Sequence, residues 1–188
     1  MQLLKERILK DAKTFPGNIL KVDSFLNHQI DVDFLCEIGK EFKKRFSGCT
    51  VTKILTIESS GIGIACVAAQ FFKCPVLFAK KTKTKNISSD VYQTKVASYT
   101  HGTSYDVVVS KEFLTVGDSV LIIDDFLANG QALLGLIDLA NQAGATVAGC
   151  GIVIEKSFQT GAELIKKTGI KLESLAKIKS LDDGVIFV

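Results

Sequence analysis

The sequence lacks any hydrophobic run that approaches the ~18 residues a membrane-spanning helix requires. Its N-terminus, Met-Gln-Leu-Leu-Lys-Glu-Arg-Ile, mixes acids and bases and has no apolar core of the kind that signal peptides carry. Neither a membrane protein nor a secreted one is therefore expected. No internal repeat or linker divides the chain, and 188 residues suit one domain with a substantial core.

Metal-binding and redox motifs are also missing. The five cysteines are an odd number, form no C-x-x-C pair, and have only two histidines to assist them as metal ligands. We therefore expect reduced, mostly structural thiols in a cytoplasmic protein. The formal net charge of +3 is too small to indicate nucleic-acid binding, although it does not oppose an anionic small substrate. A generic nucleotide-binding doubly wound domain is disfavoured, because no G-x-G-x-x-G follows the first predicted strand.

The sequence does contain alternating strand and helix patterns from residue 50 onward. Short apolar runs predict strands at residues 54–57, 76–79, 107–109, 120–124 and 147–155. Apolar residues at helical spacing predict helices at 64–72, 133–142 and 162–167, after earlier helices at 2–14 and from Asp31 or Asp33. We expect an irregular stretch at 19–30 to be an extended flap outside the core, and 184–188 to be an edge strand. The alternation predicts an α/β fold with a mostly parallel sheet flanked by helices.

Residues 120–132 carry the strongest functional signal. A buried apolar strand closes in two adjacent carboxylates, Asp124 and Asp125, and a turn of small residues then opens a helix. Free backbone N–H groups and the positive end of the helix dipole converge at such a turn and favour an anion. Two acids beside a phosphate are explained if they bind sugar hydroxyls, or a divalent metal carried by a pyrophosphate. The plain alternative is a buried strand that ends in a solvated turn.

A second strand-to-helix turn follows residues 54–57. Its sequence, Glu58-Ser59-Ser60-Gly61-Ile62-Gly63, offers hydroxyls and a helix N-terminus that suit a pyrophosphate. Taken alone, it is equally an ordinary connection. Together, two phosphate cradles that flank two acids match a sugar carrying phosphates at both ends.

These motifs occur in the same order in the type I phosphoribosyltransferases, which the chain resembles over most of its length. The run Asp-Asp-Phe-Leu-Ala-Asn-Gly-Gln-Ala resembles the signature with which that family binds 5-phosphoribosyl pyrophosphate (PRPP). The resemblance implies the family's fold in a single domain over residues 1–188, with a small hood from about 15–30 and 156–188 and a mobile loop at about 81–104. It also implies a homodimer, and Mg²⁺ carried by PRPP with no direct protein ligand.

The resemblance assigns roles to the PRPP site residue by residue. Asp124 and Asp125 would hold the ribose hydroxyls, directly or through metal-bound water. The PRPP-binding residues would be Ala128, Asn129, Gly130, Gln131 and Ala132 at the 5′-phosphate, and Ser59, Ser60 and Gly61 at the pyrophosphate.

In detail the chain is most similar to purine-salvage members that convert xanthine to xanthosine 5′-monophosphate (XMP). The resemblance places Phe126 against the purine face and Leu20, Asn27 and Lys156 around the base. Lys156 brings donors that favour a xanthine carbonyl, and Asn27 can orient its amide to donate to the 2-oxo group. Lys156 is otherwise a solvated strand end and Leu20 a core residue.

Several alternatives stay open. The first alternative is a transferase whose substrate is guanine or hypoxanthine. The second, from another class, is a non-catalytic regulator that senses PRPP. Such regulators add a DNA-binding helix-turn-helix, and little room for one precedes the first strand. Ala128 stands where some purine transferases carry an acid, so the general base is unassigned. Lys81, Lys83 and Lys85 are either pyrophosphate contacts or a solvated run; beyond them, Tyr92 and Val96 suggest that part of the long polar loop can pair as a ribbon.

Overall fold

A computed structural model describes residues 1–81, 90–98 and 103–188. Within them, six strands form one sheet in the order β10-β9-β8-β7-β3-β4, in which every pair is parallel except β10 with β9. The strands are β3 (Lys53–Ile57), β4 (Val76–Ala79), β7 (Ser119–Leu127), β8 (Thr146–Lys156), β9 (Leu172–Ser180) and β10 (Ile186–Phe187). The predicted mostly parallel sheet and the C-terminal edge strand are confirmed.

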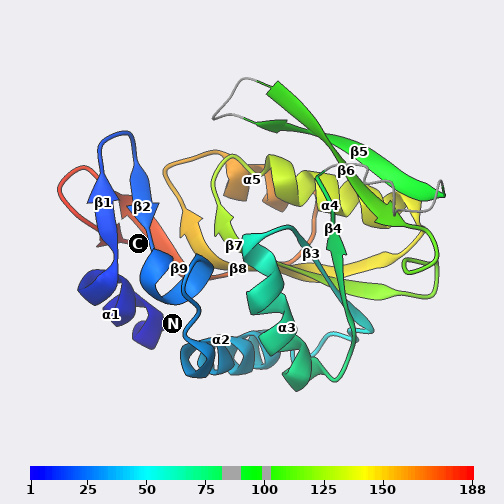
Figure 1. Cartoon of the computed structure of the whole chain (residues 1–188), viewed down its shortest axis with the longest axis horizontal. Coiled ribbons are helices and arrows are strands. Elements are labelled where there is room, and N and C mark those ends of the chain that lie inside the picture. Colours follow the sequence, from blue (N-terminus) through cyan, green and yellow to red (C-terminus); the bar gives the residue numbers. More distant parts are fainter. Residues whose placement is uncertain (82–89, 99–102) are drawn as a thin grey trace.

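Helices cover both faces of this sheet, as predicted (Figure 1). The helices are α1 (Gln2–Asp11), α2 (Val32–Arg45), α3 (Ser60–Phe72), α4 (Gln131–Gln142) and α5 (Gly161–Lys167). α2 and α3 enclose one hydrophobic core, and α4 and α5 enclose the other. Asp31, one of the two predicted caps, precedes α2, and its side chain accepts the N–H of Phe34 at 3.1 Å.

The segment at residues 19–30 differs from the prediction of a flap outside the core. β1 (Lys13–Phe15) and β2 (Ile19–Lys21) form an antiparallel hairpin beside α1, and a π-helical turn, η1 (Asp23–Asn27), follows it (Figure 1). Val22, Phe25 and Leu26 are fully buried in the core shared with α2 and α3. The prediction that this segment lies outside the core was therefore wrong. It failed because the apolar residues of the segment follow neither the period of a strand nor that of a helix.

A two-stranded antiparallel ribbon lies outside the main sheet (Figure 1). It consists of β5 (Val91–Ser98) and β6 (Thr103–Ser110), so the predicted strand at residues 107–109 belongs to this ribbon. Tyr92 pairs with Val109 and Val96 with Tyr105, as the suggested ribbon requires. Residues 82–89 and 99–102 of the expected mobile loop lie outside the described residues, so its mobility stays a prediction.

Candidate functional site

The two predicted phosphate-binding turns lie at the same edge of the sheet. β3 and β7 are adjacent parallel strands, so the turn after β3 (residues 58–63, the serine turn) lies beside the acids of β7. A Cβ added to Gly61 would lie only 3.0 Å from Oδ1 of Asp124. The turn after β7 (residues 128–132, the phosphate turn) begins three residues beyond Asp125. This adjacency is what a single ligand in contact with both turns and the acids would require.

Asp124 and Asp125 lie inside β7, and the prediction that they close the strand was wrong. The strand continues because β8 is long enough to pair with it as far as Leu127, which lies opposite Glu155. Asp124 is only 8% exposed, and its Oδ1 accepts the N–H of Asp125 at 3.0 Å. Oδ1 of Asp125 in turn accepts the N–H of Phe126 at 2.9 Å. Two adjacent carboxyl groups are thus fixed by backbone donors.

Burial raises the pKa of Asp124 well above its ordinary value, and the neighbouring charge of Asp125 raises it further. The charge of Lys81, beyond β4, opposes this with a smaller effect. In the unliganded protein, the negative charge of the ionised pair is therefore not fully balanced by nearby donors or cations. Hydroxyl donors or a cation at this point would stabilise it.

We expect Asp124→Asn to raise the thermal stability of the unliganded protein at neutral pH. Because the folded-state pKa lies above the unfolded one, Asp124 contributes stability that is complete below the unfolded pKa and is lost as the pH rises through the folded pKa. Asparagine carries no such cost, and each kcal/mol regained corresponds to about 2–4 °C in Tm. Thermal unfolding from about pH 4 to pH 8 should show the Tm difference growing with pH. A pH-independent difference would contradict the assignment.

The phosphate turn has the geometry of a helix start. Gly130 precedes α4 with φ at +81°, a left-handed conformation that glycine adopts without strain. Oδ1 of Asn129 accepts the N–H of Gln131 at 3.2 Å, and the carbonyl of Gly130 accepts the N–H of Leu134 at 2.9 Å. The remaining N–H groups in the first turn of α4 have no partner within the helix. Those groups suit an anionic ligand.

Gly161, the first residue of α5, supports this turn and was not predicted from the sequence. Its N–H donates to the carbonyl of Ala128 at 3.0 Å, and a Cβ here would lie 2.8 Å from the nitrogen of Gly130. A glycine before a short helix was visible in the sequence, but its contact with the phosphate turn depends on the packing of two distant segments.

The serine turn is shaped by close packing. Ser59 precedes α3 without a capping side-chain hydrogen bond, and α3 begins at Ser60. Gly61 is buried, and a side chain there would meet the hydroxyl of Thr56. The N–H of Ile62 donates to the carbonyl of Ser59 at 3.2 Å, and the binding of a pyrophosphate by Ser59, Ser60 and Gly61 stays a prediction.

Of the residues predicted for the base, Lys156 lies beside Phe126 and Asn27 lies beside Asp125. Nζ of Lys156 is 5.6 Å from the centroid of the Phe126 ring and donates to the carbonyl of Asn18 at 2.9 Å. Burial lowers the pKa of Lys156. Leu20, two residues beyond Asn18, belongs to the core against which Phe126 packs. Nδ2 of Asn27 donates to Oδ2 of Asp125 at 3.3 Å, and the Asn27 side-chain oxygen is buried without a described partner. That Asn27 donates to the base stays a prediction.

Three further expectations concern the lysines after β4, metal binding and membrane helices. Nζ of Lys81 lies 5.7 Å from the centroid of the Tyr105 ring, while Lys83 and Lys85 fall outside the described residues. Among the described residues, no three or more His, Cys, Asp or Glu side chains gather as a metal site. No helix in the described part of the chain is long and apolar enough to cross a membrane.

Known proteins resemble the chain in sequence and in fold. Residues 34–181 match the phosphoribosyl transferase domain. A xanthine phosphoribosyltransferase of Lachnoclostridium phytofermentans is 60% identical over 99% of this chain and 97% of that protein. Another, of Clostridium novyi, is 57% identical over 100% of this chain and 99% of that protein. The solved APRTase of Giardia lamblia complexed with 9-deazaadenine has a TM-score of 0.79 at 22% identity, covering 94% and 98% of the two chains. An identity that low shows the shared fold alone.

Proposed function

The chain belongs to the phosphoribosyl transferase domain family, and on that premise we propose that it is a xanthine phosphoribosyltransferase of purine salvage. It transfers the 5-phosphoribosyl group of PRPP to xanthine and releases XMP and pyrophosphate. The observation that supports the proposal is that two strand-to-helix turns and two adjacent aspartates lie at one edge of the sheet, beside Phe126 and Lys156. The names of relatives 57% and 60% identical to the chain support xanthine as the base.

PRPP would span the two turns. The N–H groups of the phosphate turn would bind the 5′-phosphate, and Ser59, Ser60 and the start of α3 would bind the pyrophosphate. Asp124 and Asp125, between the turns, would accept hydrogen bonds from the ribose hydroxyls. Their negative charge would also stabilise the positive charge that develops on the sugar as pyrophosphate departs.

Mg²⁺ would enter the site with PRPP. Two adjacent carboxyls fit contacts to such an ion through its water, because hard cations prefer oxygen ligands and Mg²⁺ keeps several waters. The buried position of Asp124, with its raised pKa, fits a nearby positive charge. When bound, the ion neutralises charge on the leaving pyrophosphate.

The base would stack on Phe126 with Lys156 at one edge. An ammonium group has three donors and no acceptor, so it favours the carbonyl that xanthine presents where guanine has an amino group. Burial lowers the pKa of Lys156, so solvent compensates its charge poorly and a carbonyl ligand would be a favourable partner.

A homodimer is proposed from the family resemblance. The β1–β2 hairpin exposes Phe15 and Ile19, at 44% and 47%, which fits burial against a second subunit. Sedimentation of the purified protein at several concentrations tests this. The cytoplasmic location stays a prediction.

Nucleotide formation tests the proposed function. Wild-type protein with PRPP and Mg²⁺ would be assayed with xanthine, guanine, hypoxanthine and adenine in turn, and kcat/KM should be highest for xanthine. A higher value for guanine or hypoxanthine would indicate the alternative transferase. Binding of PRPP without nucleotide formation for any base would indicate a non-catalytic sensor.

We expect Lys156→Met to raise KM for xanthine about tenfold or more, because a charge-assisted hydrogen bond is worth about 1.5–3 kcal/mol. Methionine keeps an unbranched stem over Phe126 and removes the ammonium group, with its charge and donors, on the base side of the site, so KM for PRPP should stay near the wild-type value. Steady-state kinetics with each substrate varied separately would check this. An equal rise in both KM values would argue against a contact with the base.

A further inference from the structure

Glu155, immediately before Lys156, is a buried carboxyl held by serine hydroxyls. It is 3% exposed, with Oε1 accepting from Ser157 Oγ at 2.6 Å and Oε2 accepting from Ser174 Oγ at 2.5 Å. No Lys, Arg or His in the described part of the chain forms an ion pair with it. Burial of a carboxyl is costly unless the group is paired or hydrogen-bonded, so the two serine hydroxyls are the contacts that compensate Glu155.

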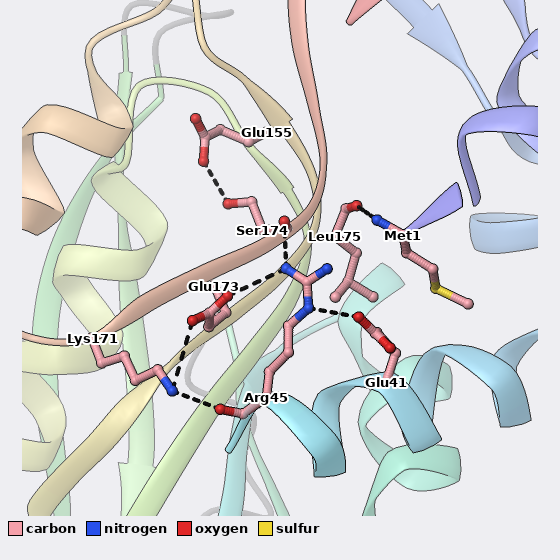
Figure 2. Close-up of polar contacts among 8 residues, drawn as sticks. All are labelled: Met1, Glu41, Arg45, Glu155, Lys171, Glu173, Ser174 and Leu175. Carbon is pink, nitrogen blue, oxygen red and sulfur yellow. Dashed lines mark hydrogen bonds and ion pairs between the residues drawn. The ribbon is translucent and has the colours of Figure 1, made fainter. Parts of the chain in front are cut away.

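The two hydroxyls connect Glu155 to different parts of the molecule. Ser174 lies in β9, and its carbonyl accepts from Arg45 of α2 at 3.1 Å (Figure 2). Arg45 also pairs with Glu41 and Glu173, so this side is anchored by several contacts (Figure 2). Ser157, by contrast, lies in the connection between β8 and α5 (residues 157–160), on the side of the phosphate turn.

That connection ends at the support of the phosphate turn. Ser157 is fixed at its N–H by the carbonyl of Ile178 at 2.9 Å and at its hydroxyl by Glu155. The chain then turns into Gly161, whose N–H binds the carbonyl of Ala128. Glu155 itself lies opposite Leu127, the last residue of β7 before the phosphate turn. The carboxyl therefore fixes the start of the connection, and the connection carries Gly161 to the phosphate turn.

We propose that Glu155 is a positioning residue that acts through Ser157 and Gly161 to hold the phosphate turn in its PRPP-binding geometry. The proposal rests on the proposed function and adds to it a residue that touches no substrate. Its neighbour Lys156 is held separately, by strand pairing with Ile178 and by the carbonyl of Asn18. Loss of the Glu155 contact should therefore affect the phosphate side of the site more than the base side.

Ser157→Ala and Ser174→Ala form a matched pair, since each removes one hydroxyl from the same carboxyl. Ser157→Ala should raise KM for PRPP about tenfold, equivalent to about 1.4 kcal/mol, with KM for xanthine and kcat changed less than threefold. Ser174→Ala should lower Tm but change KM for PRPP little, because strand pairing on both sides still holds Glu155. Glu155→Ala should act as Ser157→Ala does, and Glu155→Gln, which can still accept from a serine, should recover most of the affinity for PRPP.

Hydrogen–deuterium exchange of the unliganded variants supplies a readout that does not depend on activity. Peptides covering residues 128–132 and 157–161 should exchange faster in Ser157→Ala than in wild type or Ser174→Ala. Unchanged exchange, or faster exchange without a rise in KM for PRPP, would overturn the proposal, as would equal KM effects of the two serine variants. A wild-type protein that forms no nucleotide would refute the proposed function, and the exchange comparison would still decide whether Glu155 holds the phosphate turn.

Discussion

Asp125→Asn should lower kcat/KM for nucleotide formation by about 100-fold, because one charge-assisted hydrogen bond contributes about 1.5–3 kcal/mol. Oδ2 of Asp125 accepts from the amide of Asn27 at 3.3 Å, whereas its Oδ1 accepts from the N–H of Phe126. Asparagine retains one carbonyl oxygen for that N–H and loses the negative charge. The loss should fall mainly on kcat, since the charge matters most when the sugar becomes positive.

Steady-state kinetics and thermal unfolding together check this prediction. Asp138→Asn is the matched control, because Asp138 is an exposed carboxylate on α4 that accepts a hydrogen bond from Gln142. The control should keep wild-type turnover, and Asp125→Asn should keep its Tm within a few degrees. Turnover like that of the wild type in Asp125→Asn would remove the assigned role of this acid.

The two variants of the acid pair should separate activity from stability. Asp124 is the buried member with the raised pKa, so its replacement should stabilise the unliganded fold, whereas Asp125 is partly exposed and accepts a hydrogen bond from Asn27. Functional sites commonly lower the stability of the unliganded fold, and a bound ligand restores that stability.

Local sequence was sufficient to predict the turns of the site. Asp124, Asp125 and Gly130 lie between a buried apolar run and the start of a helix, so one short stretch of sequence indicates their chemistry. The alternation of strands and helices then placed the serine turn at the same edge, because carboxyl ends of parallel strands meet there. The adjacency of β3 and β7 in the structure confirms this step.

Contacts between distant segments could not be predicted in the same way. β9 was missed because two lysines and a glutamate interrupt its apolar residues, yet it pairs with β8 and supplies Ser174 to Glu155. The burial of Phe25 was missed because η1 has no regular period. The support of the phosphate turn by Gly161 depends on where α5 packs, which no local pattern encodes.

Gly161→Ala should reduce kcat/KM for PRPP about 100-fold, because a displacement of about 1 Å at a substrate-positioning element can cost that much. The new Cβ would lie 2.8 Å from the nitrogen of Gly130 and 2.9 Å from Cδ1 of Leu127, so the phosphate turn or α5 must shift. Overpacking of this kind also costs about 1–3 kcal/mol of stability, which should appear as a lower Tm.

Gly117→Ala is the matched control for this substitution, because a Cβ at Gly117 meets no heavy atom within 4 Å. PRPP kinetics, direct PRPP binding and Tm would be measured for both variants. The control should match wild type in all three, while Gly161→Ala should lose PRPP binding beyond what its lower Tm explains at a temperature where it stays folded. If folded Gly161→Ala binds PRPP as tightly as the wild type, displacement of the phosphate turn does not affect binding, and this turn cannot be the binding site of the 5′-phosphate. The steric clash therefore tests the phosphate turn itself, independently of the hydrogen bonds of Glu155.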